Sequence, residues 1–201
     1  MNGTEYLFNE ELPAGSVLSV CGAGGKTSLI RKLRKLYTEK GKKVLVATST
    51  HMMREEEIFS HSSSILEALA EKGSAVAGKA DPRNPAKMVS PGMDVLAEVI
   101  SSADLCLIEA DGARHMRFKV PYPHEPVIYP FTTHIAVVYG LAAVGQRIRD
   151  VCYNPEGTAQ ALQCSVEDRL DENMMVRAIS ETYIRKFREI CPDIPVLLCP
   201  F

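Results

Sequence analysis

A glycine-rich segment that ends in Lys-Thr carries the clearest chemistry in this sequence. Residues 22–28 read GAGGKTS, and they follow a short apolar run, Val17–Val20. Glycines let the backbone curl so that its N–H groups point at a phosphate, and a helix that begins directly behind them adds the positive end of its dipole. The lysine can reach the β- and γ-phosphates, and the threonine hydroxyl can bind Mg²⁺. We therefore predict that nucleotide phosphates bind at Gly22, Ala23, Gly24, Gly25, Lys26, Thr27 and Ser28.

The spacing of this loop differs from that of the usual P-loop. In the pattern G-x-x-x-x-G-K-[ST] a glycine stands six residues before the lysine, and here that position holds Val20. The loop is G-x-x-G-K-T, a shortened form in which it is similar to the loop of Mur-ligase-type ATPases. One alternative is a glycine turn with a solvated lysine. Another is a dinucleotide-binding turn, but Thr27 stands where its third glycine is required, and Thr48-Ser49-Thr50 stand where an acid would hold a ribose.

Two carboxylates follow another apolar run. Leu105–Ile108 leads into Glu109-Ala110-Asp111-Gly112, which is typical of a Walker-B strand that aims an acid at Mg²⁺. Residues two apart in an extended chain share one face, so Glu109 and Asp111 could work together. We predict both as Mg²⁺ ligands beside Thr27 and, with Lys26, as catalytic residues; one would orient the ion and the other the attacking water or acceptor. The alternative is a pair of carboxylates on a solvated loop.

Two more polar segments could complete the site. Thr48 and Thr50 follow the second apolar run, where a hydroxyl could reach Mg²⁺ or the γ-phosphate, and His51 could contact substrate. The alternative is a hydroxyl-rich turn that caps the segment Arg54–Ile58. Downstream of the acids lies a polar, proline-stiffened loop that is either solvated or an acceptor or partner site. Its candidate residues are Arg114, Lys119, His124 and Glu125.

A parallel sheet would bring these segments together. Short apolar runs that do not alternate are typical of strands buried on both faces, and helical patterns lie between them. We therefore predict an α/β fold of three layers, P-loop NTPase-like, with a mostly parallel central sheet and ligands at the carboxyl ends of its strands. The other expected strands are Val44–Ala47, Ile135–Val138 and Val196–Leu198. The expected helices are Thr27–Lys40, Glu57–Lys72, Met93–Ser102, Gly157–Cys164 and Glu172–Ile190, with loops or short edge strands at Lys79–Gly92 and at Val120–Pro130.

Length and composition exclude several classes of protein. The chain has 201 residues, 46% hydrophobic and 24% charged, which suits one globular domain over residues 1–201. Its end on an apolar run suggests that a C-terminal segment is missing. The sequence has no apolar run long enough to span a membrane and no basic apolar leader, and its net charge of −2 argues against nucleic-acid binding. The spacing of six cysteines and five histidines does not indicate a zinc site, and unpaired cysteines favour the reducing cytoplasm.

Several blocks together resemble a known family. They are GAGGKTSL (22–29), TSTH (48–51), EADGAR (109–114), K-x-P (119–121) and HEPVI (124–128), and they resemble the selenium-dependent hydroxylase accessory protein family, YqeC, over about residues 13–165. The resemblance implies a P-loop NTPase-like fold with nucleotide at the glycine loop and Mg²⁺ at Glu109 and Asp111. It also implies a part in the maturation of selenium-dependent molybdenum hydroxylases, with such a hydroxylase or its cofactor-assembly proteins as partners.

The expected function is that of a cytoplasmic, Mg²⁺-dependent NTPase that prefers ATP to GTP. Two alternatives stay open. The chain could be a small-molecule kinase or ligase of the P-loop class, which would need a second pocket. It could also be a non-catalytic, nucleotide-gated metallochaperone, which would bind nucleotide tightly without turnover.

Overall fold

The predicted apolar runs form the strands of one sheet. The computed structural model describes residues 1–54 and 57–201. Within these residues, six strands pair side by side in the order β4-β2-β7-β1-β8-β9, and every pair is parallel. The α/β class and the parallel central sheet are thereby confirmed. The strands are β1 (Ser16–Gly22), β2 (Val44–Thr48), β4 (Ser74–Ala77), β7 (Leu105–Glu109), β8 (His134–Tyr139) and β9 (Val196–Pro200).

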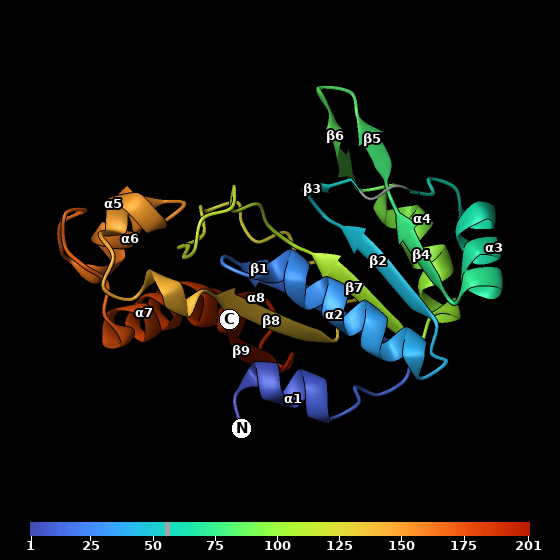
Figure 1. The fold of residues 1–201 in the computed structure, drawn as a ribbon, viewed down its shortest axis with the longest axis horizontal. Helices are drawn as coiled ribbons and strands as arrows, with labels where there is room; N and C mark the ends of the chain where they lie inside the picture. Colours follow the sequence, from blue (N-terminus) through green and yellow to red (C-terminus); the bar gives the residue numbers. More distant parts are fainter. Residues whose placement is uncertain (55–56) are drawn as a thin grey trace.

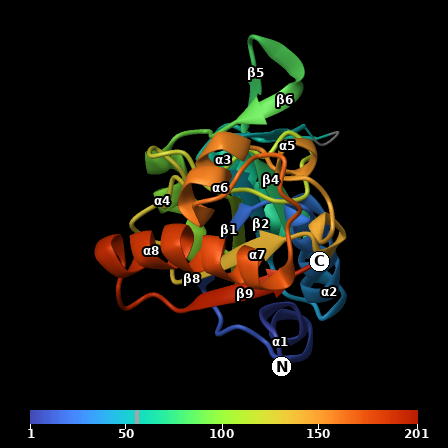
Figure 2. The same cartoon turned by 90° about the vertical axis from the view of Figure 1, so that its left-hand side faces the viewer.

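Helices cover both faces of this sheet, which explains why its strands are continuously apolar (Figures 1 and 2). Leu18 and Val20 pack in the cluster formed with α1 (Gly3–Asn9) and α2 (Lys26–Glu39). Cys21 points to the opposite face, into a cluster with residues of the C-terminal helices, and Val17 packs in the cluster under α3 and α4. The elements of this second layer are α3 (Ser62–Lys72), α4 (Met93–Val99), α7 (Glu172–Ile179), a π-helical turn (Ser180–Ile184) and α8 (Arg185–Ile190). Helix α6 (Pro155–Leu162) packs beside α7, and α5 (Ile148–Val151) packs beside α6.

The register of the central strands brings the polar segments to one edge. Val20 pairs with Glu109 across β1 and β7, and Thr48 pairs with Glu109 across β2 and β7. Since the three strands are parallel, the segments that follow them emerge at the same edge of the sheet. The glycine loop, the hydroxyl-rich segment and the acidic segment therefore meet there.

A small antiparallel sheet stands beyond this edge (Figure 1). Among the described residues it comprises three strands in the order β3-β6-β5: β3 (His51–Met53), β6 (Asn84–Val89) and β5 (Lys79–Asp81). The short strands expected within Lys79–Gly92 are thus confirmed. Thr50 leads directly into β3 rather than into a helix. The alternative in which it caps Arg54–Ile58 involves residues 55 and 56, which lie outside the described residues.

One helix boundary differs from its prediction, and some elements were not expected. The helix expected over Glu57–Lys72 begins only at Ser62, because Phe59 is bridged to Ala77, and its amide donates to the carbonyl of Val76 at 2.9 Å. Strand β4 and helix α1 were not expected; α1 begins with a capping box between Asn2 and Glu5.

No helix in residues 1–54 or 57–201 is long and apolar enough to cross a membrane.

The burial of the cysteines gives a test of the fold. All six are free, and four of them (Cys21, Cys106, Cys152 and Cys199) are buried. Burial raises the pKa of Cys106, Cys152 and Cys199 to about 12 and that of Cys21 well above its ordinary value. We expect iodoacetamide at pH 8 to alkylate the partly exposed Cys164 and Cys191 first, and the other four only after unfolding in urea. Peptide mass spectrometry checks this, and rapid labelling of Cys106 in the folded protein would contradict the fold.

Candidate functional site

The glycine loop makes a tight turn between β1 and α2. Gly22 and Gly24 have φ of 96° and 81°, values that side-chain-bearing residues rarely adopt. A Cβ on Gly24 would lie 2.4 Å from the carbonyl oxygen of Arg117, and one on Gly22 would lie 2.1 Å from that of Val138. Glycine is therefore required at both positions by the close approach of neighbouring backbone.

The amides of the loop divide into two groups. The amide of Gly22 donates to both oxygens of Asp111 at 3.1 Å, and that of Ala23 donates to the carbonyl of Val138 at 2.9 Å. The next residues begin α2, whose first intrahelical donor is Leu29, bonded to Gly25 at 2.8 Å. No side chain caps this helix, so the first amides of α2 present the positive end of its dipole. An anion would therefore meet the amides of residues 24–28 rather than those of Gly22 and Ala23.

Lys26 is folded back against the loop. Its Nζ donates to the carbonyl of Gly22 at 2.5 Å and lies 3.1 Å from Asp111 Oδ1. Burial alone would lower the pKa of Lys26, but the charges of Asp111 and Glu109 outweigh it and raise the pKa above its ordinary value. The side chain is therefore a buried cation beside the free amides of α2.

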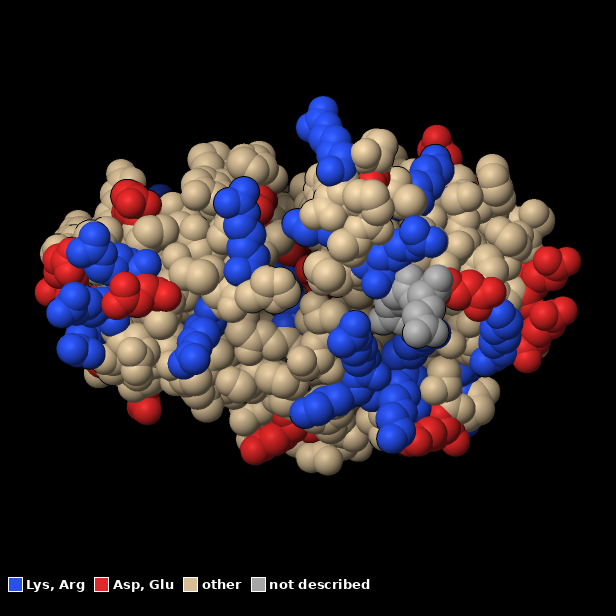
Figure 3. Space-filling model, turned by 45° about the horizontal axis from the view of Figure 1, so that its top comes forward, with Lys and Arg blue, Asp and Glu red and all other residues tan. Residues whose placement is uncertain are grey.

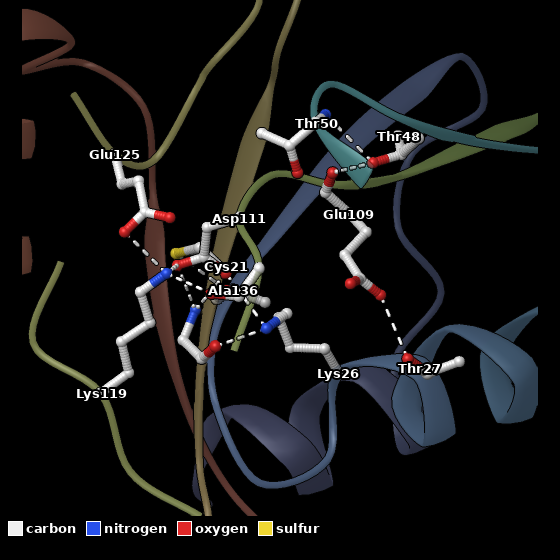
Figure 4. A network of polar contacts seen from close by, with 12 residues as sticks. Cys21, Lys26, Thr27, Thr48, Thr50, Glu109, Asp111, Lys119, Glu125 and Ala136 are labelled. Atoms are coloured by element: carbon white, nitrogen blue, oxygen red, sulfur yellow. Dashed lines mark hydrogen bonds and ion pairs between the residues drawn. The ribbon is translucent and has the colours of Figure 1, made fainter. Parts of the chain in front are cut away.

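Asp111 lies at the centre of a buried ionic network (Figure 4). Its side chain is fully buried, and besides the Gly22 amide and Lys26 it contacts Lys119 Nζ at 3.3 Å and accepts from the hydroxyl of Tyr183 at 2.9 Å. Lys119 is also fully buried; it donates to the carbonyl of Gly112 and lies 2.8 Å from Glu125 Oε2 and 4.7 Å from the ring centre of Tyr153. The network joins β7, the glycine loop, the segment 112–125 and the π-helical turn.

Glu109 points in another direction. Its Oε2 accepts from the hydroxyl of Thr27 at 3.1 Å, on the α2 side of the loop (Figure 4). Burial raises the pKa of Glu109, while Lys26 and Thr27 act in the opposite sense. Thr48 is buried, donates to the carbonyl of Glu109 at 3.0 Å and accepts from the amide of Thr50 at 3.1 Å. Among the described side chains, Thr50 Oγ1 is the buried polar atom that has no hydrogen-bond partner.

A cavity of about 770 Å³ opens above the loop, a size within the usual range of small-molecule sites. Figure 3 shows the molecule hollowed on this side, with acidic and basic side chains inside the hollow. Of the predicted site residues, those that line the cavity are Gly24, Gly25, Lys26, Thr27, Ser28, Thr50, His51, Glu109, Arg114, His124 and Glu125. Those that lie behind its wall are Gly22, Ala23, Thr48, Asp111 and Lys119.

Four polar residues of this region were not among the predicted site residues. Lys87, His115 and Tyr153 line the cavity, and Tyr183 bonds to Asp111 behind it. His115 directly follows the predicted Arg114 and could have been included with it. The other three lie in elements that no motif marks, and only the fold brings them to the site.

The network around Asp111 predicts a large effect on stability. Asp111→Asn keeps the size of the side chain but removes the carboxylate charge that lies beside two buried lysines. We expect the free energy of unfolding to fall by about 3–5 kcal/mol, the usual cost of breaking a buried ion pair. Urea unfolding followed by circular dichroism measures this. The exposed Asp193→Asn serves as the control and should change stability by less than about 0.5 kcal/mol; equal midpoints for the two variants would contradict the network.

Comparison with known proteins shows to which family the chain belongs. The family model described as "YqeC protein" matches residues 18–156, which include the glycine loop, the acidic segment and the loop that carries Lys119 and Glu125. Protein YqeC of Escherichia coli (strain K12) is 33% identical over 146 residues, or 66% of this chain and 55% of the relative, so the chain spans about half of that relative's length. No solved structure matches the chain. Since the family model covers more than half of the sequence, the chain belongs to the YqeC family.

Proposed function

We propose that this protein binds and hydrolyses a nucleoside triphosphate, ATP in preference to GTP, with Mg²⁺. The observation that carries the proposal is the uncapped start of α2, which opens into the cavity together with Lys26 and the pair Thr27–Glu109. A helix N-terminus favours phosphate oxygens, and a lysine beside it adds a full positive charge. The cavity is large enough for a small-molecule ligand to extend from these groups.

The donor set beside the loop suits Mg²⁺. Thr27 and Glu109 offer a hydroxyl and a carboxylate that already lie 3.1 Å apart. Among the described residues, no group of three or more His, Cys, Asp or Glu side chains is placed to hold a metal ion. The ion would therefore take its remaining ligands from phosphate oxygens and water, as Mg²⁺ commonly does in nucleotide sites. Thr50, whose buried Oγ1 has no hydrogen-bond partner, also lines the cavity.

The residues would divide the work as follows. Lys26 exchanges the carbonyl of Gly22 for phosphate oxygens and, with the first amides of α2, stabilises charge on the β- and γ-phosphates. Mg²⁺, when bound at Thr27 and Glu109, supplies further neutralisation of that charge. Water attacks the γ-phosphorus, the bond to the β–γ bridging oxygen breaks, and the diphosphate and phosphate leave. Asp111 keeps the Gly22 amide and Lys119 in place, and we assign it a positioning role rather than direct contact with Mg²⁺ or water.

The biological role that we propose follows the resemblance of this chain to the selenium-dependent hydroxylase accessory protein family. In this role, nucleotide turnover in the cytoplasm supports a step in the maturation of such a hydroxylase, with that enzyme or its cofactor-assembly proteins as partners. Several residues of the blocks that carry the resemblance line the cavity, among them Arg114, His124 and Glu125. A kinase or ligase that uses the same loop is the second candidate, since the cavity wall continues beyond Thr27 and Glu109. A nucleotide-gated metallochaperone is the third.

Calorimetric titration with Mg–ATP and Mg–GTP tests nucleotide binding. We expect the wild-type protein to bind ATP more tightly and Lys26→Ala to bind it at least tenfold more weakly, because the variant loses the cation that meets the phosphates. Lys35→Ala is the matched control, since this lysine lies on the same helix with its side chain 76% exposed, and its affinity should not change. Chelation of Mg²⁺ should weaken binding as well. Binding that is equal in wild type and Lys26→Ala, or absent from both, would refute the proposed site.

Phosphate release separates the three candidates once binding is established. Turnover by the protein alone supports the hydrolase. Turnover only with an added acceptor supports the kinase or ligase, and tight binding without turnover supports the metallochaperone.

A further inference from the structure

We propose that the part of the cavity beyond Thr27 and Glu109 is a second binding site, for an anionic small molecule with an apolar or aromatic body. This inference rests on the proposed function, because the second site opens into the cavity that would hold the nucleotide phosphates. Its wall combines Lys87, Arg114 and His124 with Met53 and Tyr153, which come from elements outside the glycine loop.

Basic groups dominate this part of the wall. Arg114 comes from the segment after β7 and Lys87 from β6, and His124 adds an imidazole. Of the two acids on the cavity wall, Glu125 is neutralised by Lys119 at 2.8 Å, and Glu109 lies at the proposed Mg²⁺ site. Two anions can share one cavity only if additional positive charge offsets their repulsion. Arg114 and Lys87 supply that charge, and an arginine suits a carboxylate or phosphate group in particular.

The backbone that presents Arg114 is strained. The turn from Ala113 to Met116 is closed by a hydrogen bond of 2.9 Å, and its two central residues, Arg114 and His115, have φ of 44° and 64°. Such turns favour Asn-Gly, because a side chain in the left-handed region costs about 1–3 kcal/mol. Here both positions hold large polar residues that line the cavity. Strain of this kind is typical of residues that a binding site must orient.

Apolar side chains make up the remainder of this wall. Met53 and Val127 are among the large hydrophobic residues with the most exposed surface, 41% and 37%, and both line the cavity. Tyr153 is held in place, since Arg114 lies 5.8 Å and Lys119 4.7 Å from its ring centre. Methionine adapts to irregular shapes, and a fixed tyrosine ring offers an edge or a face for stacking. The wall therefore suits a molecule with both a negative group and an apolar body.

Simple aromatic probes test the second site. The protein is saturated with Mg²⁺ and a non-hydrolysable ATP analogue, and binding of phenyl phosphate, benzoate and uncharged benzyl alcohol is followed by saturation-transfer difference NMR. We expect saturable binding of phenyl phosphate or benzoate and none of benzyl alcohol; the better of the two anions identifies a phosphate or a carboxylate ligand. The double variant Lys87→Gln/Arg114→Gln should bind the anionic probe at least tenfold more weakly than the wild type. Arg185→Gln, on the exposed face of α8, should bind the probe as the wild type does.

Controls distinguish failure of this inference from failure of the proposed function. The double variant must still bind Mg–ATP as the wild type does, which shows that it is folded. In the absence of nucleotide, Lys26→Ala should bind the anionic probe as tightly as the wild type does, although the variant has lost its affinity for ATP. The inference is overturned if neither anion binds, if benzyl alcohol binds as well as the anions, or if the double variant binds the probe normally. Loss of probe binding in Lys26→Ala also overturns it, since the anion would then occupy the glycine loop.

Discussion

One buried carboxylate, Asp111, holds the candidate site together. It bonds to the amide of Gly22, lies between Lys26 and Lys119, and accepts a hydrogen bond from Tyr183. These partners come from the glycine loop, the segment after β7 and the π-helical turn of the opposite layer. A buried charge is tolerated only when it is paired and hydrogen-bonded, so these parts must keep their relative positions for the fold to be stable. The conformation of the glycine loop is thereby fixed before any ligand arrives.

This constraint separates the two acids of the segment Glu109–Asp111. Asp111 lies behind the cavity wall, whereas Glu109 lines the cavity and meets Thr27. Asp111 thus supports the loop, whereas Glu109, two residues earlier, is the carboxylate that a ligand in the cavity would contact. A ligand that draws Lys26 toward the cavity would leave Asp111 with Lys119 as its neighbouring cation. Lys119 belongs to the segment 112–125, which also lines the cavity, so in the proposed function occupancy of the loop would be linked to that segment.

The sequence predicted much of this arrangement because its signals are local. Continuous apolar runs mark strands that are covered on both faces, and GAGGKTS marks a turn into a helix. The role of Asp111 was not predictable, since its partner Tyr183 is 72 residues away and lies on an element that no motif marks. Helix α3 starts late because Phe59 bridges to Ala77, a pairing that depends on the position of β4. Lys87 reaches the cavity only because β6 folds back beside β3.

A crystal structure with Mg²⁺ and a non-hydrolysable ATP analogue would test the central claim most directly. We expect the β- and γ-phosphates to lie against the amides of residues 24–28 and Lys26, and the ion to lie beside Thr27 and Glu109. Asp111 should still accept a hydrogen bond from the Gly22 amide. Phosphates bound elsewhere, or Asp111 turned out of its network to contact the ion, would contradict the claim.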